Sequence, residues 1–266
     1  MIPVVGWEQL ENLDISQLNG FQVGIYKVLQ ILSSIFIFAV PAILFSKAKT
    51  GDSLSYLQLH EKPNNVALFL SIGVMMTVLP FVGYIGYWNQ GLVLPDFLSD
   101  VEAWMRSSEQ QMAEMLEVFL VMDSPLDLVI NLLMVAVLPA IGEEFLFRGT
   151  LQSFLKEWTR KPHLAIWVTA FVFSFIHFQF YGFFPRFILG VVLGYLFYWS
   201  GCLWYPIIGH FFNNGLQVVL VYAGVMSLDD TGAEMADSLV MIVVATVVCG
   251  LLAYGYRSLF VAKKTL

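Results

Sequence analysis

Charged residues are scarce in this chain, since aspartate, glutamate, lysine and arginine together make up 12% of its 266 residues. Soluble globular proteins carry about 25%, so this scarcity excludes an ordinary water-soluble domain. Cysteine is also rare, because only Cys202 and Cys249 are present and no motif spacing joins them. Their spacing excludes a disulfide framework and a metal site built on cysteine. The net charge of −7 gives no support to nucleic acid as a partner.

Basic residues are absent before Lys27, although Glu8, Glu11 and Asp14 lie in that segment. A cleavable signal peptide begins with a positively charged region. We therefore expect the first apolar segment to be retained as a membrane helix.

Apolar residues dominate what is present, at 58% of the chain with a mean hydropathy of +0.75. Repeated apolar runs near 20 residues are typical of membrane-spanning helices. The sequence therefore predicts an all-α, polytopic transmembrane bundle with about seven spans. The predicted spans are residues 22–46, 65–88, 127–150, 163–181, 184–200, 203–224 and 238–257.

Basic residues gather on alternate connections between these spans. By the positive-inside rule, the side that carries them is cytoplasmic, which places the N-terminus outside and the C-terminus inside. The acidic loop at 226–236 then lies outside. Ten of the 13 basic residues follow this pattern: Lys47, Lys49, Lys62, Arg148, Lys156, Arg160, Lys161, Arg257, Lys263 and Lys264.

The connection at 89–126 spaces apolar residues at helical intervals among charged ones. It predicts an interfacial amphipathic helix, packed on the bundle or acting as a lid. We divide the chain into an N-terminal region at 1–126, a membrane core at 127–224 and a last span with its tail at 225–266. In the core, Gly190 and Gly194 predict close helix packing.

Ionisable residues inside apolar spans are costly and mark functional sites. The candidates for a catalytic site are Glu143, Glu144, Arg148, His177, His210 and Asn214. If the third and fourth spans pair antiparallel about residue 160, Glu143 lies level with His177. His210 enters the bundle just after a cytoplasmic turn, so we expect the site in the cytoplasmic half, with a cavity that opens to the cytoplasm.

Helix geometry divides the roles of the paired carboxylates. Glu144 and Arg148 are four residues apart and can form a charge-assisted pair, while Glu143 points about 100° away and can face a cavity. Pro139 and Gly142 favour a kink that admits water. The alternatives are a buried ionic cluster of Glu143, Glu144 and Arg148, and histidines that only bond neighbouring helices. Together the six residues supply a base, a histidine pair and oxyanion donors, which suits amide hydrolysis.

Three motifs make the chain resemble a known family. Glu143-Glu144-x-x-x-Arg148, Phe173-x-x-x-His177 and His210-x-x-x-Asn214 resemble those of the CAAX prenyl protease and bacteriocin-processing (Abi) family of intramembrane proteases. The resemblance covers residues 127–224. It implies that Glu143 and His177 activate a water, that His210 and Asn214 stabilise the oxyanion, and that Glu144 and Arg148 hold the geometry.

The resemblance leaves metal dependence open. Glu143, His177 and His210 could bind a divalent metal such as zinc, which would make the protein a metalloprotease, but the His-Glu-x-x-His signature is absent. We favour a water activated directly by glutamate. The expected partners are membrane lipids and a peptide or lipidated protein substrate, prenylated or not. The alternatives are a non-catalytic scaffold or bacteriocin-immunity protein, and a proton-coupled transporter, which should show inverted repeats that the sequence lacks.

Overall fold

The computed structural model describes residues 19–226 and 238–264, with side chains up to residue 261. Every regular element in these ranges is helical, as predicted. Glu8, Glu11 and Asp14, most of the acidic loop at 226–236, and the side chains of Lys263 and Lys264 lie outside this description.

The first long helix consists of α2 (Gly20–Ser33), the π-helical segment η2 (Ser34–Ala39) and α3 (Val40–Thr50). The third span is likewise continuous and contains two π-helical segments. Its parts are α7 (Pro125–Asn131), η4 (Leu132–Val137), α8 (Leu138–Glu144), η5 (Phe145–Gln152) and α9 (Ser153–Thr159). The remaining elements are α4 (Ser53–Tyr56), α5 (Asn65–Gln90), η3 (Asp96–Leu98), α6 (Ser99–Phe119), α10 (Pro162–Phe175), η6 (Phe180–Gly182), α11 (Phe183–Ser200), α12 (Trp204–Tyr222) and α14 (Leu239–Lys264).

Local sequence signals fix most helix ends. Asn64 caps α5, because its side chain accepts a hydrogen bond from the backbone of Ala67. Ser124 and Asp127 form a reciprocal capping box at the start of α7, with Pro125 at its first position. At the other end of this continuous helix, Arg160 adopts a left-handed backbone with φ of 56° and turns the chain into α10.

Helices occupy all seven predicted places, but not all of them have the length and composition of a membrane span. Among the described residues, α10 is an apolar helix of only 14 residues, and α12 carries several polar side chains, including His210 and Asn214. Five segments are long and apolar enough to cross a membrane: Gly20–Thr50, Asn65–Gln90, Pro125–Thr159, Phe180–Ser200 and Leu239–Val261.

The segment at 163–181 was predicted as one span, and this part of the prediction is wrong. The helix α10 ends at Phe175, and Phe178 takes a left-handed backbone with φ of 52°. The turn is held from outside the helix, since Ser174 Oγ donates to the carbonyl of Phe183 at 2.7 Å. His177 therefore lies in a turn rather than inside a helix.

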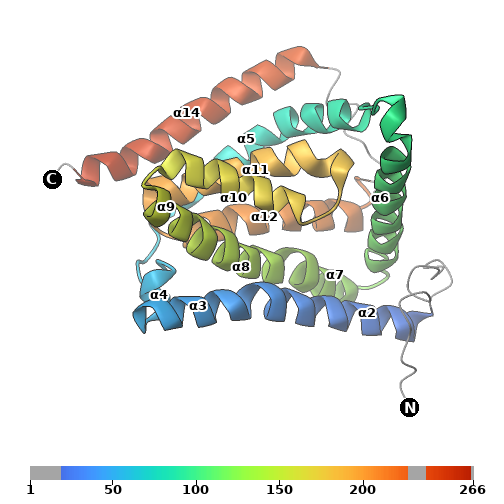
Figure 1. The fold of residues 1–266 in the computed structure, drawn as a ribbon, viewed down its shortest axis with the longest axis horizontal. Coiled ribbons are helices and arrows are strands. Elements are labelled where there is room, and N and C mark those ends of the chain that lie inside the picture. Colours follow the sequence, from blue (N-terminus) through green and yellow to red (C-terminus); the bar gives the residue numbers. More distant parts are fainter. Residues whose placement is uncertain (1–18, 227–237, 265–266) are drawn as a thin grey trace.

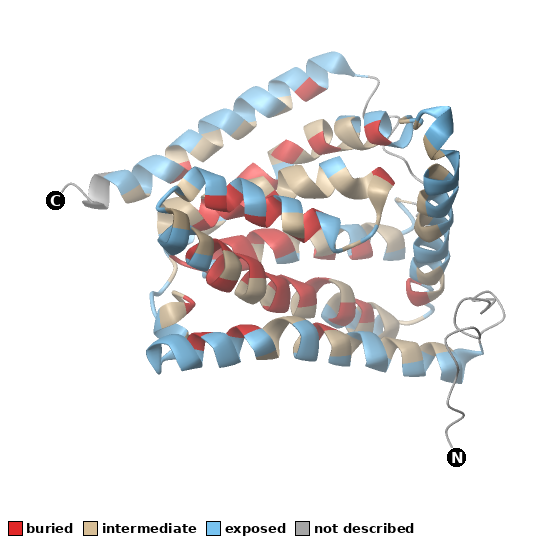
Figure 2. Ribbon diagram, viewed as in Figure 1, coloured by how far each residue is buried: buried red, intermediate tan, exposed pale blue. Residues whose placement is uncertain are grey.

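The helices are arranged around α10, α11 and α12 (Figure 1). The segment α2–α3 runs along one side of this centre and α14 along the other, while α6 closes one end. Buried residues concentrate in α8, α10, α11 and α12, whereas α2 and α14 are largely exposed (Figure 2). In a membrane protein such exposed apolar faces are the surfaces that contact lipid. The polar candidates thus belong to the most enclosed helices.

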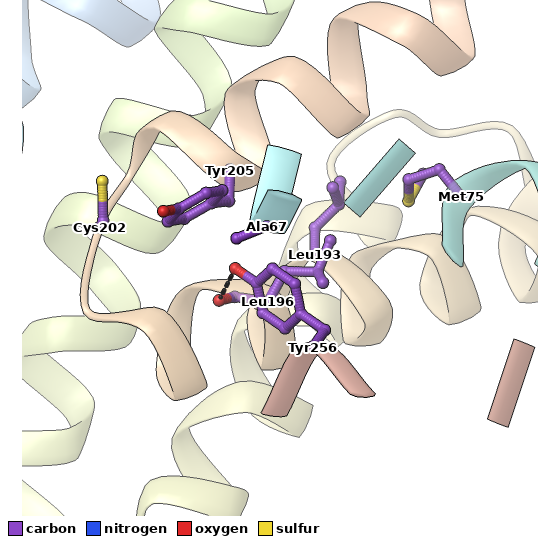
Figure 3. Close-up of a cluster of buried hydrophobic side chains, with 7 residues drawn as sticks. All are labelled: Ala67, Met75, Leu193, Leu196, Cys202, Tyr205 and Tyr256. Atoms are coloured by element: carbon purple, nitrogen blue, oxygen red, sulfur yellow. Dashed lines mark hydrogen bonds between the residues drawn. The ribbon is translucent and has the colours of Figure 1, made fainter. Parts of the chain in front are cut away.

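One apolar cluster joins the central helices to α5 and α14 (Figure 3). Tyr256 of α14 is fully buried and its hydroxyl donates to the carbonyl of Leu196 at 3.0 Å. The cluster contains Ala67, Met75, Leu193, Leu196, Cys202, Tyr205 and Tyr256. Both cysteines of the chain are free, and Cys202 packs here as an apolar residue. The cluster fixes α11 against α12, the helix that carries His210.

The predicted amphipathic helix between the second and third spans is present as α6. Its side chains hold the short element η6: Trp104 packs against Phe180, Arg106 lies over the ring of Tyr181, and Glu109 accepts a hydrogen bond from the backbone of Tyr181 at 3.2 Å. These contacts attach α6 to the chain segment that follows His177.

Candidate active site

Glu144 and Arg148 form a fully buried ion pair within the third span. Arg148 Nη1 donates to Glu144 Oε1 at 2.8 Å, and both side chains have no exposed surface. Arg148 Nη2 donates to the carbonyl of Gly190 at 2.9 Å, and the guanidinium lies 4.8 Å from the ring centre of Phe173. Gly190 also allows α11 to pack closely on α10, because a Cβ there would meet the Cβ of Ala170 at 3.1 Å. The predicted pair and the predicted close packing at Gly190 are confirmed.

His210 connects this pair to the second carboxylate. Its Nδ1 donates to Glu144 Oε1 at 2.8 Å, so the same oxygen serves Arg148 and His210. The ring nitrogen that faces a carboxylate carries a hydrogen, which leaves the lone pair of the neutral ring at Nε2. That Nε2 lies 3.9 Å from Glu143 Oε2. Glu144 therefore determines both the orientation and the tautomer of His210.

Asn214 lies one turn beyond His210 on the same face of α12, as predicted. Its Nδ2 donates to the carbonyl of Val135 at 3.0 Å and lies 3.3 Å from His210 Nε2. Asn213 Nδ2 donates to Asn214 Oδ1 at 3.0 Å, which fixes the direction of the amide. The Asn214 amide consequently directs a hydrogen at the lone pair of His210 Nε2.

A cavity of about 540 Å³ lies next to these residues. Glu143 lines it, whereas Glu144 and Arg148 do not, so the predicted division between a free and an anchored carboxylate is confirmed in its geometry. Apolar side chains from α5 and α6, including Met75, Met112 and Phe119, make up much of the remaining wall. The polar lining residues are Gln30, Glu143, His177, Gln179, Arg186, His210, Asn213, Asn214 and Gln217.

His177 reaches this cavity from the turn after α10. Its Nδ1 lies 2.7 Å from the carbonyl of Phe173 and therefore carries the hydrogen. The second ring nitrogen, Nε2, remains as an acceptor. The ring of Phe173 packs edge-on against both His177 and His210, at 5.1 and 6.2 Å between ring centres. Glu143 and His177 line the same cavity, and a turn rather than a continuous helix brings His177 there.

The described residues contain no group of three or more histidine, cysteine, aspartate or glutamate side chains placed to hold a metal ion. Glu143, His177 and His210, the set that the sequence left open for zinc, do not form such a group in the part of the chain that the structure describes. The Nδ1 of His210 bonds Glu144, and its Nε2 lies 3.9 Å from Glu143 Oε2.

Two residues of the site region are absent from the sequence prediction. Asn89, buried at the end of α5, donates to the carbonyl of Phe180 and accepts from the backbone of Phe184, both at 3.0 Å. Arg186 lines the cavity from α11. No feature of the neighbouring sequence identifies Asn89 as a site residue. Arg186 could have been identified, because it is a charged residue within an apolar span.

Four side chains of α6 line the cavity, which therefore extends to the end of the bundle where α6 lies (Figure 1). The basic turn at Arg160 and Lys161 lies at the opposite end, between α9 and α10. The sequence predicts a cavity that opens on the basic side, whereas the lining residues from α6 extend it to the other end. The helix α6 is thus both a wall of the site and a cover over one of its ends.

Comparison with known proteins gives a match to the same part of the chain. Residues 125–216 match the family described as type II CAAX prenyl endopeptidase Rce1-like. The uncharacterized protein YpbD of Bacillus subtilis (strain 168) is 29% identical over 85 residues, which cover 30% of this chain and 40% of YpbD. The chain thus spans less than half the length of that relative. No solved structure matches.

The matched range contains both glutamates, Arg148, both cavity histidines and Asn214, and it covers α12 as far as residue 216. The buried cluster of Glu143, Glu144 and His210 agrees with the glutamate and histidine motifs of such proteins. The chain therefore contains, at residues 125–216, a domain of the Rce1-like type II CAAX prenyl endopeptidase family.

Proposed function

We propose that the protein is an intramembrane endopeptidase that hydrolyses a peptide bond with a water activated by Glu143. The observation that carries this proposal is the arrangement of four polar residues around one cavity, with Glu144 and Arg148 behind its wall. Glu143, His177, His210 and Asn214 all line the cavity. A carboxylate base, a histidine acceptor and an amide donor are the groups that amide hydrolysis requires.

In the first step, Glu143 takes a proton from a water that also donates a hydrogen bond to His177 Nε2. The oxygen of this water then adds to the carbonyl carbon of the substrate. His177 suits the positioning role, because its Nδ1 is engaged with the carbonyl of Phe173 and only Nε2 is available. Glu143 suits the role of base, because it is not committed to an ion pair as Glu144 is.

The tetrahedral intermediate carries a negative oxygen that needs hydrogen-bond donors. Asn214 Nδ2 supplies one, since the hydrogen that it directs at His210 Nε2 in the free protein can turn to the oxyanion. His210 supplies a second donor when it is protonated, and Glu144 at 2.8 Å stabilises that cation. Glu143 finally transfers its proton to the leaving amine, which restores the carboxylate.

We propose a peptide or a lipidated protein as the substrate, processed near its end or close to the membrane. The family match supports peptide or protein substrates, and a prenylated Cys-a-a-X tail is one candidate within that class. The catalytic unit would be residues 127–224. The regions at 1–126 and 225–266 would complete the membrane bundle around it.

The test is cleavage of a defined peptide panel by the purified full chain in phospholipid nanodiscs. The panel contains S-farnesylated Cys-a-a-X peptides and the same peptides without the lipid, and mass spectrometry reads the products. The wild type should cleave at one position and Glu143→Gln should not, while the control Glu61→Gln, at an exposed position, should cleave normally. Equal product from wild type and Glu143→Gln would refute the proposal.

The finer membrane placement is also proposed. We infer that α10 and α12 enter the membrane with the five longer segments, giving seven, and that the basic turns face the cytoplasm. In a variant without native cysteines, Lys161→Cys should react with an impermeant thiol reagent only after the cells are opened. Labelling of intact cells at position 161 would reverse this orientation and place the C-terminus outside.

A further inference from the structure

Arg186 is a second arginine beside the site, half-buried, and its hydrogen bonding is incomplete. It lies in the first turns of α11 and lines the same cavity as Glu143 and His177. Its Nη2 donates to Gln179 Oε1 at 2.6 Å, but Gln179 is neutral. Its Nη1 is buried and has no hydrogen-bond partner among the described residues.

Arg148 differs from Arg186 in having a carboxylate partner, although its Nε is also buried without a hydrogen-bond partner among the described residues. It has a carboxylate at 2.8 Å, a carbonyl at 2.9 Å and an aromatic ring below it. Among the described residues, no carboxylate forms an ion pair with Arg186. Glu109 of α6 and Glu143 act on it electrostatically without making a hydrogen bond.

An unpaired cation in an apolar surrounding is unfavourable, because burial removes water without supplying an opposite charge. Its place on α11 adds to this, since the N-terminal end of a helix already carries a partial positive charge. Both effects are relieved by one anion that binds the guanidinium from the cavity. Glu143 and Arg186 line the same cavity, so such an anion lies in the same space as the site of hydrolysis.

On the basis of the proposed function, we propose that Arg186 binds the free α-carboxylate at the C-terminus of the substrate. The cavity is mainly apolar, and methionines such as Met75, Met112 and Met115 adapt to varied apolar side chains. Gly182 packs tightly on the guanidinium, since a Cβ there would lie 3.2 Å from Arg186 Nη2. A substrate whose C-terminus lies against Arg186 does not have to continue past Gly182. A substrate that offers an internal acidic side chain to Arg186 would have to do so.

Two matched peptides test this assignment: an S-farnesylated Cys-a-a-X peptide with a free carboxylate, and the same peptide with a C-terminal amide. A charge-assisted hydrogen bond predicts that wild type prefers the acid by about 10- to 100-fold in kcat/KM, mainly through KM. In Arg186→Gln the ratio should fall to about one. Arg186→Lys should retain part of it, and Arg257→Gln, an exposed arginine on α14, should retain all of it.

A ratio near one in the wild type overturns the assignment. So does an equal loss for acid and amide in Arg186→Gln, because Arg186 would then act on Glu143 and not on the substrate terminus. Binding of both peptides to Glu143→Gln gives a readout that does not need cleavage. Selective binding of the acid without cleavage by the wild type refutes the protease and keeps the assignment, whereas cleavage without selectivity does the reverse.

A lipid phosphate is the other source of a suitable anion. Measurements in nanodiscs of phosphatidylcholine, with and without phosphatidylglycerol, separate it from a peptide carboxylate. The preference for the acid should be the same in both. Stabilisation of the wild type by phosphatidylglycerol that is lost in Arg186→Gln, together with an acid-to-amide ratio of one, would identify a lipid site and overturn the proposal.

Discussion

Glu143 and Glu144 are adjacent in the sequence and occupy opposite environments. Glu144 is completely buried and its Oε1 accepts hydrogen bonds from Arg148 and His210. Glu143 lines the cavity, and its Oε2 lies 3.9 Å from His210 Nε2. A rotation of about 100° along the helix therefore separates Glu144, which holds neighbouring side chains, from Glu143, which faces the cavity. The pair therefore lets structural and chemical roles be tested at neighbouring positions.

The largest effect is expected for Glu143→Gln. The amide keeps the size of the side chain but cannot accept a proton, so cleavage should fall by at least about 100-fold. The thermal midpoint should change little, because no ion pair is lost. Initial rates of peptide cleavage and thermal unfolding in nanodiscs measure the two effects.

The reversed result has a definite meaning. If Glu144→Gln is inactive and stable while Glu143→Gln still cleaves, the base is Glu144 and the assignment made here is wrong. We expect Glu144→Gln to lose stability as well as activity, since it weakens the contacts to Arg148 and His210.

Arg148→Ala should destabilise the protein instead of acting only on the rate. Removal of one partner leaves Glu144 buried without its charge partner, which costs about 3–5 kcal/mol for a dry pair. His210 would also lose its fixed carboxylate. Chemical or thermal unfolding of Arg148→Ala and Arg148→Leu measures the loss. A stable but inactive Arg148→Ala would show that the buried pair contributes to catalysis alone.

A smaller effect is expected at Gly142, the residue before the two glutamates. A Cβ there would lie 3.1 Å from both the carbonyl of Ser34 and the Cβ of Phe38, on the first long helix. Gly142→Ala should cost about 1–3 kcal/mol through this overpacking. Gly250→Ala on α14, where a Cβ meets nothing within 4 Å, is the matched control and should leave stability unchanged or slightly higher. Equal stability of both variants would show that the two helices move apart without cost.

The smallest effect concerns Glu109, a third carboxylate, on α6. Burial raises the pKa of Glu109, while the hydrogen bond from Tyr181 and the charge of Arg186 oppose this rise. Since the pKa of Glu109 is raised on folding, its contribution to the stability of the protein is most favourable below pH 4.5 and is lost as the pH rises through the folded pKa. Glu109→Gln should therefore be more stable than the wild type by about 0.5 kcal/mol or less at pH 7, and equally stable below pH 4.5.

Thermal unfolding of the wild type and Glu109→Gln across this pH range measures the effect. A loss of stability in Glu109→Gln at pH 7 would show that attraction to Arg186 outweighs the cost of burial.

Features that depend on local geometry could be predicted from the sequence. The pair of Glu144 and Arg148 follows from a spacing of four residues, and so does the shared face of His210 and Asn214. The helices at all seven apolar segments follow from composition. The amphipathic helix α6 follows from the spacing of its apolar residues.

Features that depend on distant contacts could not be predicted. The bond between His210 and Glu144 joins residues 66 positions apart. The end of α10 lies in a sequence without proline or glycine and is fixed by Ser174 with Phe183 and by Asn89 on α5. Nothing near His177 in the sequence marks a turn, because the next glycine is Gly182.

The π-helical segments affect how this protein should be aligned with its relatives. Each π turn takes up one more residue than an α turn, so a count of 100° per residue loses its phase across it. The segment η4 precedes Glu143 and η5 follows it. A relative that is one residue shorter at either segment can still present the same helix face on both sides. A single-residue gap at these places is therefore compatible with an unchanged site, whereas a gap between Pro139 and Glu143 would turn the carboxylate away from the cavity.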